Sequence, residues 1–216
     1  MDEIGLWREG PDPTRGFAFG PALFLDRDGV LIDDTGYLHD PAGVVLIPGV
    51  AALVAACNRA AVPVVVVTNQ SGIGRGYYGW PDFVAVQARL AAMLAAAEAD
   101  ARLDMVLACA YHPEADGDFA ILDHPWRKPN PGMLHAAADA LPIDLARSWI
   151  IGDRATDLAA ARAAGLAGGL HLSGATDPIS EERRQARNLA SEDFAVIAAR
   201  SLTEAGGVVE RLTNAG

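Results

Sequence analysis

Polar residues follow several apolar runs in this chain of 216 residues, and their types suit a site that handles a metal ion and an anion. Four such groups occur: Asp26 with Asp28, Thr68 with Asn69, Arg127 with Lys128, and Asp153 with Asp157. Each group alone is ordinary turn chemistry, because Asp, Asn and Ser are common where strands end. In open parallel sheets, however, ligands bind at the carboxyl ends of the strands. Four such groups in one chain therefore predict one shared site.

The residue types in these groups fit the transfer of a phosphoryl group. Carboxylates can hold Mg²⁺, which prefers oxygen ligands and commonly binds together with a substrate phosphate. Thr68 and Lys128 can bind the remaining phosphate oxygens, one by a hydrogen bond and the other by charge. Asp26 can then attack phosphorus, while Asp28 protonates the leaving oxygen and later activates a water molecule.

The segments between these groups alternate between strand-like and helix-like patterns. Short apolar runs, several of them β-branched, predict strands over 22–25, 44–47, 64–67, 105–109, 149–151, 169–172 and 194–197. Alanine-rich or amphipathic stretches predict helices over 48–60, 81–99, 131–140, 155–164 and 180–189, and a terminal helix. This alternation predicts an α/β fold, a three-layer, doubly wound parallel sheet with helices on both faces. The Gly- and Pro-rich residues 1–20 predict an irregular arm that packs through Leu6 and Trp7, and 21–216 predict a single domain.

The charge balance limits the partners that the chain can bind. Seventeen basic residues face 28 acidic ones, which leaves a net charge of −11 and disfavours nucleic acid and acidic membranes. An anionic small molecule must then be attracted by local cations or by a metal. All basic residues except Lys128 are arginine, so the lone lysine indicates a need for a compact point charge.

Several sequence features predict a cytoplasmic protein. The two cysteines, Cys57 and Cys109, are too few for a disulfide framework. No cationic leader followed by an apolar run occurs, and no run of 18 uncharged apolar residues. We expect a monomer or a weak homo-oligomer that acts on a small phosphorylated sugar or metabolite.

The four groups resemble the motifs of the haloacid dehalogenase-like phosphatase superfamily. The matching strings, in the order of the family, are Asp26-Arg27-Asp28-Gly29-Val30, Thr68, Lys128 and Gly152-Asp153-Arg154-Ala155-Thr156-Asp157. The resemblance implies a Rossmann-like haloacid dehalogenase fold in which Asp26 is the nucleophile and Asp28 the acid and base. It further implies that Thr68 and Lys128 bind phosphate, and that Mg²⁺ is held by Asp26, the backbone carbonyl of Asp28 and Asp153. Asp157 would orient this site from behind, although an acid that merely starts a helix is an equal alternative.

Longer strings are similar to one branch of that superfamily, which contains heptose 1,7-bisphosphate and histidinol-phosphate phosphatases. They are Gly36-Tyr37-Leu38-His39, Val67-Thr68-Asn69-Gln70-Ser71-Gly72-Ile73, Arg75-Gly76 and Arg127-Lys128-Pro129-Asn130-Pro131-Gly132-Met133. The branch implies that Asn69, Arg75 and Arg127 lie near the phosphorylated sugar. The 40 residues from Asp28 to Thr68 leave no room for the helical lid of mutase-like relatives, so we expect a capless or minimally capped site. The expected reaction is Mg²⁺-dependent hydrolysis of D-glycero-D-manno-heptose 1,7-bisphosphate at its 7-phosphate, with histidinol phosphate or another small phosphorylated metabolite as the alternative.

The chain departs from this branch in a segment that often holds a structural zinc ion. Many members carry Cys-x-His and Cys-x-Cys there, but this chain keeps only Cys109. Tyr111 replaces a histidine, and His124 and Trp126 replace the second cysteine pair. A site made from Cys109, His112 and His124 lacks an evident fourth ligand, so structural zinc is not expected.

Two other functional classes fit the residues less well. A signalling receiver domain also places acids, a Thr and a Lys at strand ends, but it gives Asp28 no role. A binding module without catalysis would lack at least one catalytic side chain, whereas all of those expected are present.

Overall fold

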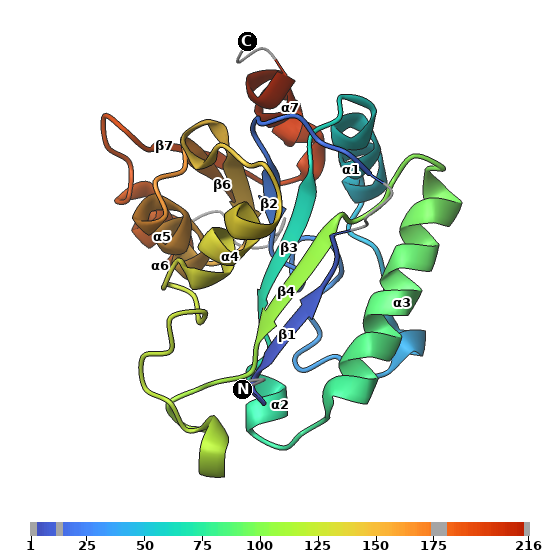
Figure 1. The fold of residues 1–216 in the computed structure, drawn as a ribbon, viewed down its shortest axis with the longest axis vertical. Helices are drawn as coiled ribbons and strands as arrows, with labels where there is room; N and C mark the ends of the chain where they lie inside the picture. The colour runs from blue at the N-terminus through green and yellow to red at the C-terminus, as the bar shows by residue number, and fades with distance from the viewer. Residues whose placement is uncertain (1–3, 12–14, 174–180, 214–216) are drawn as a thin grey trace.

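The computed structural model describes residues 4–11, 15–173 and 181–213. A seven-stranded sheet runs through the molecule in the order β1-β4-β3-β2-β5-β6-β7 (Figure 1). The strands are β1 (Leu6–Glu9), β2 (Leu23–Leu25), β3 (Val64–Asn69), β4 (Met105–Cys109), β5 (Trp149–Gly152), β6 (Gly168–Leu172) and β7 (Ala195–Ala199). β2 to β7 pair in parallel, and β1 pairs antiparallel to β4. The predicted α/β fold is confirmed, with one antiparallel edge strand.

Helices cover both faces of the sheet, as Figure 1 shows. They are α1 (Val50–Arg59), α2 (Ser71–Gly74), α3 (Trp80–Ala97), α4 (Gly132–Ala140), α5 (Ala155–Ala163), α6 (Glu181–Arg187) and α7 (Gly206–Thr213). One apolar core contains buried residues of α1, α3 and α7, and a second core contains residues of α4, α5 and α6.

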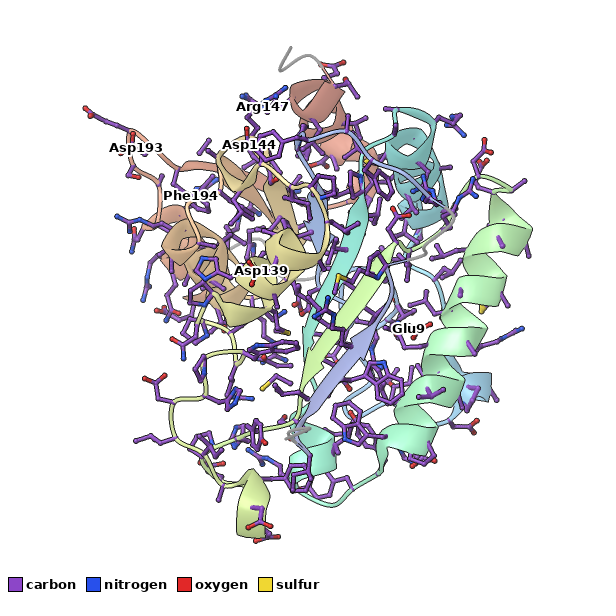
Figure 2. The ribbon with its side chains drawn as sticks, viewed as in Figure 1. Glu9, Asp139, Asp144, Arg147, Asp193 and Phe194 are labelled. Carbon is purple, nitrogen blue, oxygen red and sulfur yellow. The ribbon has the colours of Figure 1, made fainter. Side chains whose placement is uncertain are left out.

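Alternating side chains of the strands divide between the two cores. Leu23 and Leu25 of β2 belong to the first core, and Phe24 between them belongs to the second. β3 does the same, because successive side chains of a strand point to opposite faces. Figure 2 shows the side chains that fill the space between helices and sheet. β2 and the first four residues of β3 are apolar at every position because both faces of the sheet are covered there. Their sequences are therefore continuous apolar runs rather than alternating ones.

The register of the central strands brings the polar groups together. Leu25 of β2 pairs with Val66 of β3 and with Ile151 of β5. The residues that follow these positions, Asp26 and the ends of β3 and β5, therefore meet at one edge of the sheet. Between Asp28 and Thr68 the helical elements are one 3-10 turn (Pro41–Gly43) and α1, so no helical lid is inserted there.

Two sequence-based predictions differ from the structure, and one short helix was not predicted. Residues 6–9, predicted to be irregular, form β1, because Trp7 packs on Trp80 and the chain pairs with β4. Residues 44–47 form no strand and make only an isolated bridge, between Ile32 and Leu46. The short helix α2, which follows β3, was not among the predicted elements.

The remaining helix and strand predictions agree with the structure to within a few residues. Some predictions fall partly outside the described residues. They concern the arm at 1–3 and 12–14, the start of the predicted helix at residue 180, and the chain end after 213. No helix among those described is long and apolar enough to cross a membrane.

Candidate active site

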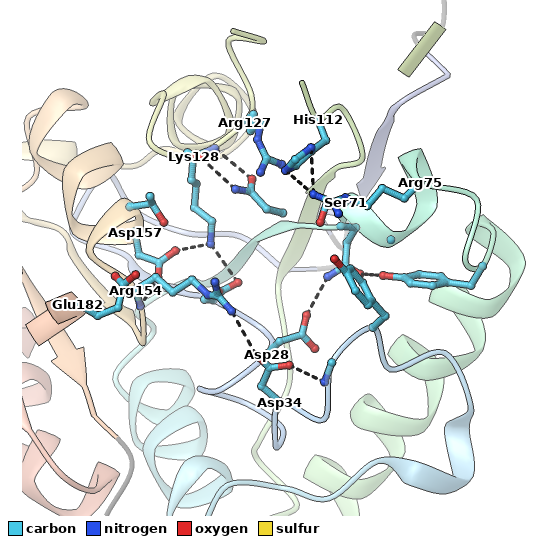
Figure 3. A pocket seen from close by; sticks show the side chains of 18 residues that line it. Asp28, Asp34, Ser71, Arg75, His112, Arg127, Lys128, Arg154, Asp157 and Glu182 are labelled. Carbon is cyan, nitrogen blue, oxygen red and sulfur yellow. Dashed lines mark hydrogen bonds and ion pairs between the residues drawn. The ribbon is translucent and has the colours of Figure 1, made fainter. Parts of the chain in front are cut away.

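A cavity of about 470 Å³ opens at the carboxyl ends of β2, β3 and β5 (Figure 3). Most of the predicted site residues line it: Asp26, Asp28, Asn69, Arg75, Arg127, Lys128 and Asp157. Thr68 and Asp153 are not among its lining residues. The four groups picked out in the sequence thus meet at one place, although two of their members do not line the cavity itself.

Lys128 lies between two acids of the site and forms an ion pair with each of them. Its Nζ lies 3.0 Å from Asp26 Oδ1 and 2.5 Å from Asp157 Oδ1, and donates to the Val67 carbonyl oxygen at 2.7 Å. Only 3% of the lysine is exposed. Burial opposes its charge, but the two carboxylates outweigh burial and raise the pKa of Lys128 above its ordinary value. The lysine is therefore a fixed cation beside Asp26.

Asp157 contacts both Lys128 and the first turn of α5. Its Oδ2 accepts a hydrogen bond from the Arg154 backbone N–H at 3.0 Å, which caps the helix. Burial raises the pKa of Asp157 to about 6, although Lys128 acts to lower it. Asp157 therefore starts a helix, as one alternative expected, and it also pairs with Lys128 and lines the cavity rather than lying behind it. Its role in orienting the site stays a prediction.

The acids Asp26, Asp153 and Asp157 form a group suited to a divalent cation. Each can offer an oxygen that lies within 4.8 Å of the others. Asp153 Oδ1 is buried and has no hydrogen-bond partner among the described residues. Burial, then Asp26 and Asp157, raise the pKa of Asp153 to about 8, as expected for a carboxylate that lacks a counter-ion. A buried, unpartnered oxygen among hard carboxylate ligands fits Mg²⁺.

Gly29 permits the close approach of Asp153 to the loop after β2. Its φ is +77°, and a Cβ atom at this position would collide with the Asp153 carboxylate. A residue with a side chain would be strained in this conformation and would also displace Asp153.

Asp28 lies at the cavity wall with both carboxylate oxygens bound. Arg27 donates to Oδ1 from Nε at 3.1 Å and from Nη2 at 2.9 Å, and Gln70 donates to Oδ2 at 3.0 Å. Burial raises the pKa of Asp28, with Arg27 acting in the opposite direction. A raised pKa favours the protonated form that a general acid needs.

Asn69 is bound to the chain on both sides of its amide. Its Nδ2 donates to the Lys128 carbonyl oxygen at 3.0 Å, and its Oδ1 accepts from the Lys128 N–H at 3.1 Å. This pair of hydrogen bonds connects the end of β3 to the loop that carries Lys128. Asn69 was predicted to lie near the substrate, and it does line the cavity. Both ends of its amide, however, bind the backbone of Lys128 and hold that residue in place.

A second group of cations lies at another side of the cavity (Figure 3). Arg75 pairs with Glu114 at 2.9 Å and contacts the His112 ring at 3.2 Å. Arg127 donates to the Tyr111 carbonyl oxygen at 3.0 Å. Burial, then Arg127 and Arg75, lower the pKa of His112, with Glu114 acting in the opposite direction.

Several lining residues were not picked out as site residues from the sequence. Arg154 pairs with Asp34 at 3.5 Å, and Glu182 Oε2 accepts from the Ala155 N–H at 2.7 Å. Tyr37 lies at the mouth with a left-handed backbone, φ 52°. Arg154 lies within a motif quoted above, and that was its available signal. Glu182 comes from α6, far along the chain, and no local pattern marks it.

The segment compared with the zinc-binding branch is organised by ring packing. Tyr111 stacks on His124 with ring centroids 4.3 Å apart, and Cys109 Sγ lies 4.0 Å from His124 Nδ1. The Trp126 N–H donates to the same nitrogen at 3.1 Å, while His112 faces Arg75. His112 and His124 thus have partners outside the three candidate ligands, whereas Cys109 contacts His124 itself. The absence of zinc stays a prediction.

Known proteins resemble this chain in sequence and in fold. A family model described as HAD-hydrolase-like, where HAD stands for haloacid dehalogenase, matches residues 125–202. The D-glycero-beta-D-manno-heptose-1,7-bisphosphate 7-phosphatase of Mesorhizobium japonicum is 54% identical over 174 residues, which are 81% of this chain and 79% of that protein.

Two crystal structures extend the likeness to the fold. A Mesorhizobium loti protein assigned as a HAD-like phosphatase has a TM-score of 0.86 and 44% identity, over 100% of this chain and 97% of its own. D,D-heptose 1,7-bisphosphate phosphatase from B. bronchiseptica, complexed with magnesium and phosphate, has a TM-score of 0.69 and 27% identity, over 91% of this chain and 99% of its own.

Proposed function

Because this chain belongs to the haloacid dehalogenase-like phosphatases, in the branch of the D-glycero-D-manno-heptose 1,7-bisphosphate 7-phosphatases, we propose that it removes the 7-phosphate from that bisphosphate. The observation that carries the proposal is Asp26, buried beside Lys128 and two further acids at the base of one cavity. Nothing else in the described residues combines a nucleophile, a fixed cation and a cation-binding group of acids.

The proposed mechanism uses Asp26 and Asp28 in turn. Asp26 attacks phosphorus and forms an aspartyl phosphate, while Asp28 donates a proton to the leaving sugar oxygen. Asp28, now ionised, takes a proton from the water that hydrolyses the aspartyl phosphate. Lys128 lies 3.0 Å from Asp26 and offers its charge to the phosphoryl oxygens.

Mg²⁺ belongs to this proposal as the resident cofactor. Asp26 and Asp153 would hold it together with the Asp28 backbone carbonyl, and Asp157 completes the acidic group. When bound, Mg²⁺ would neutralise the carboxylates and the developing charge on the phosphoryl oxygens.

A substrate with two phosphates suits the two cationic regions of the cavity. Lys128 lies in one, and Arg75 and Arg127 line the other. We place the reacting phosphate at Lys128 and the distal phosphate at the two arginines, since each is then met by a local charge despite the acidic surface. The relative from Mesorhizobium japonicum is named for the beta anomer, and we propose the same anomer here.

Steady-state phosphate release with Mg²⁺ tests this function. The substrates are both anomers of the heptose bisphosphate, histidinol phosphate and simple sugar monophosphates. Asp26→Asn serves as the blank. Asp100→Asn is the matched control, because Asp100 is an exposed acid that pairs with the exposed Arg59. We expect kcat/KM for the beta anomer to exceed every other value by about a hundredfold, a difference near 2.7 kcal/mol.

Other results would point elsewhere. Equal low rates on all substrates, abolished in Asp26→Asn, would retain the phosphatase and refute the heptose substrate. A clear preference for histidinol phosphate would establish the alternative. We also keep a cytoplasmic location and a monomer or weak homo-oligomer as predictions from the sequence.

A further inference from the structure

A network of side chains joins Asp28 to Thr68 along one wall of the cavity. Its members beyond these two are Arg27, Gln70 and Tyr78. Gln70 is central, because its amide touches all four of the others. Gln70 follows β3 directly, so the strand that delivers Thr68 also delivers the amide.

The partners of Gln70 leave one orientation for its amide. Oε1 accepts from Arg27 Nη2 at 3.1 Å and from the Tyr78 hydroxyl at 2.5 Å. A guanidinium group can only donate, so the amide oxygen must face it. The amide Nε2 then donates to Asp28 Oδ2 at 3.0 Å and to Thr68 Oγ1 at 2.8 Å.

This orientation determines how two groups of the site can act. Thr68 Oγ1 accepts from Gln70, so its own proton is left to donate to a phosphate oxygen. The Asp28 carboxylate is held between Gln70 and the fork of Arg27 and cannot rotate freely. The Gln70 amide thus orients Thr68, which can donate a hydrogen bond to phosphate, and Asp28, the proposed acid and base.

The contacts of Arg27 and Tyr78 argue against a purely stabilising role for the network. Arg27 is only 1% exposed, and its Nη1 is buried with no hydrogen-bond partner among the described residues. Arg27 is thus desolvated while its partner Asp28 is 24% exposed, and desolvation offsets much of the attraction in such a pair. Gly72 makes room for the Tyr78 ring, since a Cβ atom there would collide with it.

We propose that Gln70, held in place by Arg27 and Tyr78, is a positioning residue that aims Asp28 and Thr68 at the same phosphoryl group. This inference rests on the proposed phosphatase activity. It implies that loss of the amide harms proton transfer to the leaving oxygen more than it harms phosphate binding. The effect should therefore depend on how strongly the leaving group needs a proton.

The test compares an alkyl phosphate with an aryl phosphate in Gln70→Met. A sugar oxygen needs a proton in order to leave, whereas p-nitrophenolate leaves without one. The value of kcat/KM covers the steps up to cleavage of the ester bond, so the later role of Asp28 as a base does not enter it. We expect kcat/KM to fall by about a hundredfold for the heptose bisphosphate and by at least tenfold less for p-nitrophenyl phosphate, since general acid catalysis contributes about 10²- to 10⁴-fold.

Two further variants keep the test independent of folding. Gln87→Met replaces another buried glutamine, in α3 and outside the network, and should leave both activities unchanged. Tyr78→Phe removes one donor to Gln70 while keeping the ring, and should shift the ratio of the two kcat/KM values in the same direction by a smaller factor.

An equal fall for both substrates, or no fall beyond that of Gln87→Met, would overturn the positioning role. A wrong heptose assignment would change the substrate preference of the wild type and not the comparison between the variants. The wild type would then prefer another alkyl phosphate, and the same ratio would be measured with that substrate. Activity that does not exceed the Asp26→Asn blank on any phosphate would refute the phosphatase itself.

Discussion

Replacing the only lysine tests whether the acidic centre depends on a single cation. Lys128→Met keeps the length of the side chain but removes the charge that lies 3.0 Å from Asp26 and 2.5 Å from Asp157. The change removes the positive charge of the lysine from the cluster formed by Asp26, Asp153 and Asp157. We expect a large loss of stability when no metal is bound.

The magnitude follows from the two ion pairs and the cost of burying them. At an effective dielectric constant of about 20, unit charges 3.0 Å apart attract by about 5 kcal/mol, and desolvation of the lysine offsets much of this. Removal of one partner from a buried pair costs about 3 to 5 kcal/mol, since the other charge stays buried. We expect that decrease in the free energy of unfolding at pH 8 in EDTA, together with a fall in Tm of roughly 10 °C.

The loss should shrink as the pH falls. Burial raises the pKa of Asp157 to about 6 even though Lys128 acts to lower it, and without the lysine that pKa must rise further. A carboxyl whose pKa is raised in the folded state carries its full penalty above that pKa, and the penalty shrinks as the pH falls toward the lower pKa of the unfolded state. The difference between wild type and Lys128→Met should therefore be largest near pH 8 and smallest near pH 5.

Urea unfolding of both proteins across this pH range provides the measurement. Arg59→Met is the matched control, because Arg59 is exposed and lies 3.4 Å from the exposed Asp100. An exposed pair contributes about 1 kcal/mol or less. If Lys128→Met stays within about 1 kcal/mol of wild type at pH 8 in EDTA, the account of a buried, lysine-compensated centre is wrong.

Two further predictions concern the metal and the edge strand. Saturating Mg²⁺ should raise the Tm of the wild type by roughly 5 to 10 °C, since a ligand at a hundred times its Kd adds about 2.7 kcal/mol. Asp153→Asn should abolish that shift, and an undiminished shift in a thermal melt would exclude Asp153 as a ligand. Trp7→Ala should lower the free energy of unfolding by about 2 to 4 kcal/mol, because the Trp7 ring packs on Trp80 at 5.7 Å and on Phe83 at 6.1 Å. A urea midpoint equal to that of wild type would show that β1 contributes nothing to the fold.

Local patterns were enough for the central part of the fold. The continuous valine run of β3 and the alanine-rich helices have strong local signals, so they were found at nearly the right residues. β1 was missed because its side chains are only half-buried or exposed, and its pairing partner β4 begins about a hundred residues away. Pairing across such a distance leaves little trace in a short Gly- and Pro-rich segment.

The amino-acid sequence by itself determined which chemical groups the site contains. Acids, a threonine and a lone lysine stand directly after apolar runs, and parallel strands must bring their carboxyl ends to one edge. The order of the elements and the types of the residues are sufficient for this prediction. Asp26, Asp28 and Lys128, which it brings together, line one cavity in the structure.

Only the tertiary structure decided what each polar atom does there. Asn69 clamps the Lys128 backbone, and Gln70 joins Asp28 to Thr68, yet neither role has a pattern along the chain. Glu182 reaches the site from α6. Hydrogen bonds act over about 3 Å and depend on angle. Their partners are therefore settled by packing between distant segments, which residue types and spacing do not encode.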